Sequence, residues 1–239
     1  MKNPLWSLRK RLCRFRSSPQ IVWYRNAKFV LDPREGLDKK IIAGQPFESE
    51  HIRHAISKIV ERKIDTIVDV GANFGLYTVL LGRIPTVRAV TSFEPVTRTY
   101  NQLCANVFAN DIDSKTCLHH CGLGNSEGDA TIYIQPWNSG LSRLVLASQS
   151  DEDKFSRIER IKIVKGDNVL TYYDQQIFMK IDVEDYAMEA LEGLSHTLEA
   201  NRGVIQVEVK AAERNVFEFL NARGWRNFLQ MPTDAFFCK

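Results

Sequence analysis

Hydrophobic positions along the chain follow two spacings in turn, one typical of buried strands and one typical of helices. Short apolar runs at 64–70 (IDTIVDV) and 203–209 (GVIQVEV) predict buried strands, and apolar residues three and four apart follow each run. Further strands are expected at 88–95, 115–121, 129–134, 177–182, 225–231 and 234–238, and helices at 74–82, 96–110, 184–200 and 213–224. This alternation predicts an α/β fold with a mostly parallel sheet covered by helices on both faces.

The beginning of the chain shows a different pattern. The segment 21–32 (IVWYRNAKFVLD) predicts a small hairpin that turns near Arg25 and Asn26, because β-branched and aromatic residues flank a polar pair. The segment 46–63 has apolar residues at helical spacing, namely Phe47, Ile52, Ala55, Ile56, Ile59 and Val60. We therefore expect an N-terminal extension over residues 1–62 that packs on a core domain over residues 63–239.

Composition and charge narrow the class of protein. The chain has 239 residues, 44% of them hydrophobic and 26% charged, which suits one α/β domain with an extension. A net charge of +3 gives no reason to expect a nucleic-acid partner. Lys and Arg cluster between Arg9 and Arg16 with apolar residues interleaved. Such a segment can contact an anionic membrane surface, or can be a solvated, frayed terminus.

Cysteine usage and hydropathy bear on the compartment. No apolar run reaches the roughly 20 residues that cross a bilayer, and no apolar stretch follows the basic residues as in a secretory signal. The five cysteines form no CxxC pair, so we expect a reducing, cytoplasmic setting. The cluster CLHHC at 117–121 resembles a set of metal ligands. It falls on an expected strand, whose alternating side chains cannot surround one tetrahedral zinc ion, and we predict no metal site.

A glycine turn follows the first strand of the core. The stretch TIVDVGANFGLYTVLL (66–81) differs from the dinucleotide fingerprint G-x-G-x-x-G, because Asn73 stands where the second glycine would approach a pyrophosphate. Asp69, just before the turn, would repel phosphate. The turn therefore favours a ligand with a cationic end and no phosphate.

The second strand supplies another acid at its end. Glu94 comes 19 positions after Gly75, where a carboxylate can accept two hydrogen bonds from the hydroxyl pair of a ribose. A ribose without phosphates and with a positive charge describes S-adenosylmethionine, which we predict as the cofactor.

Three motifs in order resemble those of the FkbM-type S-adenosylmethionine-dependent methyltransferases. They are DVGANFGLYTVLL, FEP with NQLCANVFAN behind it, and MKIDVEDYAMEALEGL, within roughly residues 64–209. The resemblance implies a class I methyltransferase fold, which is a Rossmann-like sheet of about seven strands with the last strand antiparallel. It also implies methylation of a hydroxyl group on a sugar, glycolipid or natural product.

The resemblance implies roles for particular residues. The methionine part of the cofactor would lie along the turn, against Asp69, Gly71, Asn73 and Gly75, with Ala72, Phe74 and Tyr77 beside them. Glu94 would hold the ribose with Pro95 beside it, and the turn formed by His120, Cys121 and Gly122 would pass along the adenine edge. Asp182 is also expected at the cofactor.

Acidic residues end two neighbouring strands. Asp182 and Glu184 follow the strand at 177–182, and Glu208 lies at the end of the strand at 203–209. Because adjacent strands lie about 4.8 Å apart, Asp182 and Glu208 are expected close together. Crowded carboxylates raise one another's pKa, and one with a raised pKa can take a proton from an attacking hydroxyl. We predict a catalytic role for all three; sugar binding, a divalent cation and a structural ion pair with Lys180 are alternatives.

The chain departs from the family at one motif. The family reads D-V-E-G-x-E, whereas this chain has Asp185 in place of the glycine and Ala187 in place of the last acid. The leading hypothesis is an O-methyltransferase that acts on a small-molecule or glycan acceptor. Asp185 and Ala187 favour an alternative, a module that binds S-adenosylmethionine without turnover. A NAD-dependent oxidoreductase is a further alternative, and the missing fingerprint argues against it.

Overall fold

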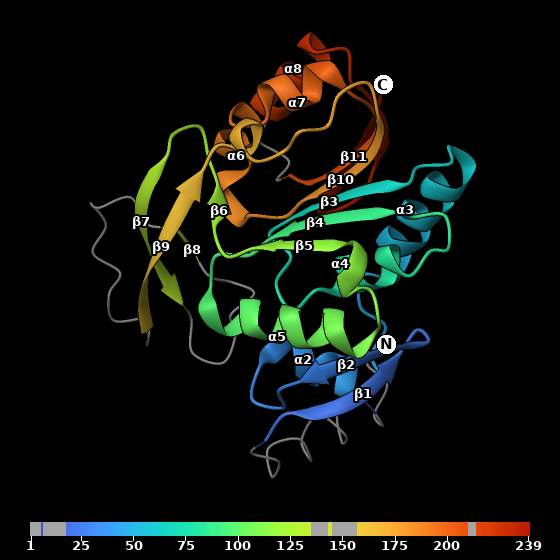
Figure 1. Cartoon of the computed structure of the whole chain (residues 1–239), viewed down its shortest axis with the longest axis vertical. Coiled ribbons are helices and arrows are strands. Elements are labelled where there is room, and N and C mark those ends of the chain that lie inside the picture. The colour runs from blue at the N-terminus through green and yellow to red at the C-terminus, as the bar shows by residue number, and fades with distance from the viewer. Residues whose placement is uncertain (1–5, 7–17, 135–142, 145–156, 210–213) are drawn as a thin grey trace.

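The computed structural model describes residues 6, 18–134, 143–144, 157–209 and 214–239, with backbone alone for 143–144. A seven-stranded sheet occupies the centre (Figure 1). Its strands in spatial order are β12 (Arg226–Gln230), β13 (Asp234–Cys238), β11 (Arg202–Glu208), β10 (Gln176–Ile181), β3 (Thr66–Val70), β4 (Ala89–Phe93) and β5 (Thr116–His119). Neighbours from β11 to β5 run parallel, and β13 runs antiparallel to both of its neighbours. The predicted α/β class and the antiparallel last strand are confirmed.

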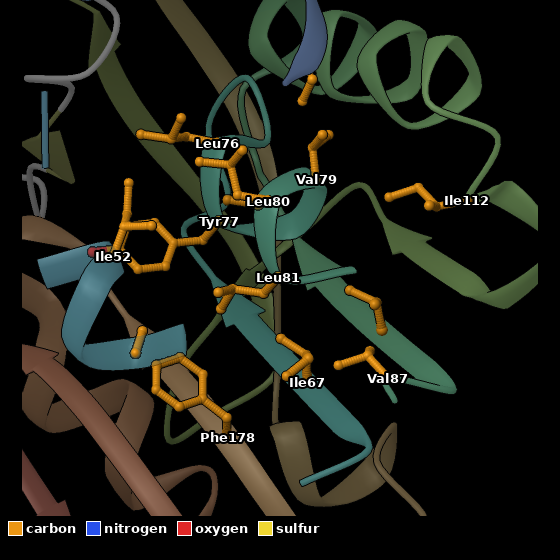
Figure 2. Close-up of a cluster of buried hydrophobic side chains, with 14 of the residues drawn as sticks. Ile52, Ile67, Leu76, Tyr77, Val79, Leu80, Leu81, Val87, Ile112 and Phe178 are labelled. Carbon is orange, nitrogen blue, oxygen red and sulfur yellow. The ribbon is translucent and has the colours of Figure 1, made fainter. Parts of the chain in front are cut away.

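Helices cover both faces of this sheet, because both faces of its inner strands are apolar. On one face lie α3 (Ser49–Glu61), α4 (Leu76–Gly82) and α5 (Thr97–Ala109), and on the other lie α6 (Ala187–Glu192), α7 (Ser195–Ala200) and α8 (Arg214–Ala222). Figure 2 shows Ile67 and Phe178 on the side that α4 covers. Their chain neighbours Val68 and Met179 belong to the core on the opposite face.

The N-terminal hairpin forms as predicted. It consists of β1 (Gln20–Tyr24) and β2 (Ala27–Leu31), and both turn residues, Arg25 and Asn26, have positive φ (51° and 61°). Two such residues make the type I′ turn that matches the twist of a hairpin. A short helix, α2 (Gly36–Ile42), follows; its seven residues are too few to give a clear helical pattern in the sequence.

Side-chain amides attach the hairpin to α5. Asn106 Oδ1 accepts from the backbone N–H of Val30 (2.6 Å), and Asn110 Oδ1 accepts from that of Lys28 (3.0 Å). Asn110 Nδ2 donates in turn to the carbonyl of Lys28 (2.7 Å). The edge of β2 is thereby hydrogen-bonded to a helix instead of to another strand.

A second, smaller sheet stands beside β5. Its strands in order are β6 (Gly122–Leu123), β9 (Arg157–Val164), β7 (Gly128–Ile134) and β8 (Arg143–Leu144). The sequence pattern did not predict β9, whose apolar residues are interrupted by charged ones. Ile132, Ile134, Ile161 and Ile163 nevertheless pack with Val96 into a small core of their own.

The expectation of one helix over 184–200 is wrong. The segment forms a 3₁₀ turn, η6 (Glu184–Tyr186), and then α6 and α7, which are separated at Gly193 and Leu194. Gly193 packs against the backbone of Gly124, where a Cβ atom would lie 2.0 Å from the carbonyl oxygen. This close approach ends α6. Two further 3₁₀ turns are η2 (Asp113–Lys115) and η5 (Gly166–Asn168).

The sequence analysis raised two points about membranes, a spanning helix and a basic surface segment. Among the described residues, no helix has both the length and the apolar character to cross a bilayer. The basic segment from Arg9 to Arg16 lies outside the described residues.

Candidate active site

A cavity of about 270 Å³ opens at the carboxyl ends of β3, β4, β10 and β11. Ligands of open α/β sheets bind at this edge. Of the residues predicted to bind cofactor or to act in catalysis, the following line it: Asp69, Gly71, Ala72, Asn73, Phe74, Tyr77, Glu94, Pro95, Gly122, Asp182, Glu184 and Glu208. The polar positions that the sequence pattern selected are thus mostly brought together.

The glycine turn brings the end of β3 into backbone contact with the end of β10. Gly71 has φ of +79°, and a Cβ atom there would lie 1.8 Å from the carbonyl oxygen of Asp182. Asn73 and Gly75 also have positive φ (53° and 89°), so the chain turns sharply before α4 begins. Only glycine fits at position 71.

Every backbone N–H of this turn is already bonded within the protein. Gly71 and Ala72 donate to the carbonyl of Phe93 (3.0 and 2.9 Å). The next N–H groups bond inside the turn or to Glu94: Asn73 to Glu94 Oε2 (2.8 Å), Phe74 to Asn73 Oδ1 (2.8 Å) and Gly75 to the carbonyl of Ala72 (2.8 Å). Phosphate-binding turns leave such groups pointing at the anion. This turn therefore offers no anion site.

Asp69 is buried and fastens the start of α4. Its Oδ2 atom accepts hydrogen bonds from the backbone N–H (2.9 Å) and hydroxyl (2.6 Å) of Thr78. Burial raises the pKa of Asp69 to about 6 despite these bonds. Its predicted contact with the cofactor stays a prediction, because the carboxylate also has a structural task.

Glu94 is held in place from both oxygens. Oε2 accepts from Asn73 N–H, and Oε1 accepts from Val96 N–H (2.9 Å) and the Thr99 hydroxyl (2.8 Å). Burial raises the pKa of Glu94 to about 7. The bonds fix the carboxylate at the cavity wall, and Oε2 can accept a second hydrogen bond from a ligand hydroxyl.

Three of the predicted cofactor residues do not line the cavity. The ring of His120 stacks on Tyr100 with a centroid distance of 4.4 Å, and Cys121 is buried, which raises the pKa of its thiol to about 11. Gly75 faces Leu103 of α5. Their roles at the cofactor stay predictions.

Lys180 lines the cavity at its acidic end, which we define by Glu48, Asp182, Glu184 and Glu208. Its side chain is only 3% exposed, and its Nζ atom donates to Asp182 Oδ2 (3.1 Å) and Asp234 Oδ2 (3.2 Å). Burial disfavours the charged form, but the two carboxylates outweigh it and hold the pKa of Lys180 well above its usual value. The ion pair of Lys180 with Asp182, which was the structural alternative to a catalytic role, is present, with Asp234 as a second partner that the sequence pattern did not indicate.

Asp182 and Glu208 share a hydrogen bond, which requires one proton between two carboxyl groups. Partial burial opposes ionisation of Asp182, but the charge of Lys180 outweighs it and lowers the pKa of Asp182. Burial, together with the bond to Asp182, raises the pKa of Glu208 to about 9. The proton therefore belongs mainly to Glu208. The buried Oε2 atom of Glu208 has no hydrogen-bond partner among the described residues.

This pair predicts a specific pH dependence of stability. Folded Glu208 keeps its proton up to about pH 9, whereas the unfolded group loses it near its ordinary 4.5. Stability from Glu208 is therefore fully present below pH 4.5 and is lost as the pH rises toward 9. Urea unfolding of the wild type and Glu208→Gln at about pH 7.5 and about pH 9 checks this. We expect a smaller drop in midpoint for the variant; equal drops would contradict it.

The structure also shows residues that the sequence pattern missed. Leu37, Phe47 and Glu48 of the N-terminal extension line the cavity. Glu48 stands just before α3, where an acid usually indicates only a helix start, so no sequence signal marked it. Asp234 begins β13, and no short motif connects it with Lys180, which lies 54 positions away.

The departure from the family motif takes an unexpected form. Asp185, in the place of the family glycine, has ordinary backbone angles (φ −75°, ψ 17°), and the residue with positive φ is Glu184 (55°). A glycine in this motif can adopt left-handed backbone, but Asp185 does not adopt it here. Ala187 is buried at the start of α6.

The cysteine and histidine cluster lies at the edge strand β5. Cys117 is exposed, and its Sγ atom lies 3.3 Å from His119 Nε2. In the described part of the chain, no group of three or more His, Cys, Asp or Glu side chains could hold a metal ion.

Comparison with known proteins gives consistent matches. Residues 69–230 match the family described as "Methyltransferase FkbM domain". Among curated proteins, "Methyltransferase 1" of Beauveria bassiana (strain ARSEF 2860) is 23% identical over 159 residues, which are 66% of this chain and 59% of that protein. "Methyltransferase sdnD" of Sordaria araneosa is 27% identical over 154 residues, with 54% of this chain and 60% of that protein covered. The match thus spans about three fifths of each relative's length.

A solved structure shares the fold. The crystal structure of Methyltransferase FkbM from Methylobacillus flagellatus KT superposes with a TM-score of 0.51 and 16% identity, covering 74% of this chain and 44% of that one. At this identity the likeness shows the fold alone, and the strand order of the central sheet agrees with it.

Proposed function

The chain belongs to the family of FkbM methyltransferase domains, and on that premise we propose that it is an S-adenosylmethionine-dependent O-methyltransferase. The acceptor is a hydroxyl group of a sugar, glycolipid or other natural product. Because the match spans only part of each curated relative, the substrate is part of this proposal.

One observation carries the choice of cofactor. The five N–H groups from Gly71 to Gly75 are all bonded within the protein, and Asp69 and Glu94 line the same end of the cavity. A dinucleotide needs free donors for its pyrophosphate, so the site disfavours it. A cationic nucleoside fits an acidic wall, which supports S-adenosylmethionine over NAD.

Different residues serve the two ends of the cavity. Bound S-adenosylmethionine would supply an electrophilic methyl group. Glu94 holds the ribose hydroxyls, and the glycine turn lets the backbone approach the methionine part. Asp182, ionised beside Lys180, orients the acceptor hydroxyl and accepts its proton as the methyl group is transferred; its lowered pKa makes it a weaker base than the crowded carboxylate expected from the sequence, so orientation is its main contribution. Protonated Glu208 holds Asp182 in place.

Calorimetric titration with S-adenosylmethionine tests the cofactor assignment. We expect binding by the wild type, at least tenfold weaker binding by Glu94→Gln because a charge-assisted hydrogen bond is lost, and no measurable binding of NAD. Glu192→Gln, at an exposed carboxylate bonded to Asn125, is the matched control and should bind as the wild type does. A wild type that binds NAD and ignores S-adenosylmethionine would refute the proposal.

A module that binds cofactor without turnover remains the second candidate. The observation that favours it is Ala187, which is buried where the family motif carries an acid near the acceptor. Cofactor binding with no methyl transfer to any acceptor of a broad panel would support this candidate instead.

A further inference from the structure

The N-terminal extension supplies a wall of the cavity. Glu48 and Phe47 lie on the loop before α3, and both line the cavity opposite the strand ends. Glu48 has left-handed backbone angles (φ 52°, ψ 26°), which cost a non-glycine residue roughly 1 kcal/mol or more. A conformation of this kind persists where the surroundings determine it, and it places the Glu48 carboxylate at the cavity.

The Glu48 carboxylate joins the acidic end of the site. Its Oε2 atom accepts from the hydroxyl of Tyr77 (3.2 Å) and lies 3.2 Å from His51 Nδ1. Tyr77 in turn accepts from Gln206 Nε2 (2.8 Å), which also donates to Asp234 (2.7 Å). The Glu48 side chain is still 24% exposed, so part of it remains free to meet a ligand.

The balance of charge at this end is strongly acidic. Glu48, Asp182 and Glu184 line it beside protonated Glu208, and Lys180 is the one Lys or Arg among the described lining residues. Both Asp182 and Asp234 already bind Lys180. A phosphate or carboxylate entering here would meet like charges without an unpaired lysine or arginine of the described wall.

The same end has acceptor capacity for hydrogen bonds. The Oε2 atom of Glu208, a residue that lines the cavity, is buried and has no partner in the described part of the chain. A buried oxygen of this kind is normally paired, so a ligand hydroxyl or ammonium group would satisfy it.

We propose that Glu48 is an acceptor-binding residue, and that this end of the cavity takes a hydroxyl- or amine-bearing acceptor and excludes one whose entering group is a phosphate or carboxylate. The inference rests on the proposed function, since it assigns the other end of the cavity to the cofactor. It adds a chemical class for the acceptor and a role for the N-terminal extension.

Three sugars of the same ring test the proposal: glucosamine, glucose and glucose 6-phosphate. Each is titrated against the full chain saturated with S-adenosylhomocysteine, and binding is read by saturation-transfer NMR. We expect glucosamine to bind best, glucose to bind detectably, and glucose 6-phosphate to bind about tenfold more weakly than glucosamine.

The variant Glu48→Gln separates a binding role from a structural one. It keeps the shape and the bond to Tyr77 but removes the charge. We therefore expect about tenfold weaker binding of glucosamine with less than twofold change for glucose. Glu50→Gln, at a 70% exposed side chain in the first turn of α3, is the matched control and should behave as the wild type does.

Several results would overturn the proposal. One is binding of glucose 6-phosphate as tight as that of glucosamine. Another is an equal weakening of glucosamine and glucose binding in Glu48→Gln. The third is that none of the three sugars binds to the protein saturated with S-adenosylhomocysteine. Failure of the wild type to bind S-adenosylhomocysteine and S-adenosylmethionine is a different result, because it refutes the proposed function itself.

Discussion

Replacing Gly71 with alanine should lower the free energy of unfolding by about 4 kcal/mol and abolish binding of S-adenosylmethionine. The added Cβ atom would lie 1.8 Å from the carbonyl oxygen of Asp182, and the residue would also have to keep φ of +79°. The added Cβ atom and the carbonyl oxygen of Asp182 are both fixed to the backbone, so the clash could be relieved only if the ends of β3 and β10 moved apart. Urea unfolding and calorimetry measure the two effects.

Gly128→Ala is the control for this variant. Gly128 begins β7, and a Cβ atom there would meet no atom within 4 Å. We expect its free energy of unfolding to stay within about 0.5 kcal/mol of that of the wild type. If Gly71→Ala were as stable as Gly128→Ala, the tight contact between the two strand ends would be disproved.

Replacing Lys180 with methionine should cost about 3–5 kcal/mol of stability at neutral pH. Methionine fills a similar volume, but the buried carboxylate of Asp234 and the partly exposed carboxylate of Asp182 would lose their common partner. The pair would then take up a proton, and the destabilisation should shrink as the pH falls. Urea unfolding at neutral and at acidic pH checks both statements.

The matched control removes a lysine from a surface ion pair. Lys58 donates to Glu61 one turn along α3 (2.7 Å); its side chain is 28% exposed and lies over the Phe228 ring, and that of Glu61 is 58% exposed, so both are far more solvated than Lys180. Lys58→Met should change stability by no more than about 0.5 kcal/mol. If Lys180→Met and Lys58→Met lost similar free energies of unfolding, the buried ion pairs of Lys180 would contribute no more to stability than a surface pair.

The contact of Asp182 with Glu208 was predictable from the sequence, because it depends on strand register alone. Both acids follow apolar runs of neighbouring parallel strands, and Ile181 pairs with Val207 just before them. The neighbourhood of Asn73 and Glu94 was predictable for the same reason. Periodicity identifies strands, and parallel strands bring their ends to one edge of the sheet.

The position of Glu48 could not be predicted in this way. It belongs to the N-terminal extension, and no periodic pattern states how that extension docks on the sheet. Phe47 and Leu37 reached the cavity wall unpredicted for the same reason, since tertiary packing placed them. Asp234 reaches Lys180 through the antiparallel pairing of β13 with β11, in which Asp234 stands opposite Glu208.

The break after α6 shows another limit of the sequence pattern. Apolar residues continue at helical spacing through the segment 184–200, so one helix was expected. The chain turns instead at Gly193, which packs on the backbone of Gly124, a residue nearly 70 positions earlier. A contact between two distant glycines leaves no trace in local periodicity.

The two asparagines that bind β2 also fix the alignment of the hairpin. Asn106 and Asn110 are one helical turn apart, about 6 Å, and the N–H groups of Lys28 and Val30 that they bind are about 6.8 Å apart along the strand. Because the two spacings are similar, both hydrogen bonds form together in only one alignment of β2 along α5. Sliding β2 by a single residue would break both bonds and turn Phe29 and Leu31 out to water. The two asparagines thus fix the register of the hairpin on α5, and they also occupy the edge of β2, so that strands from other molecules cannot pair with it.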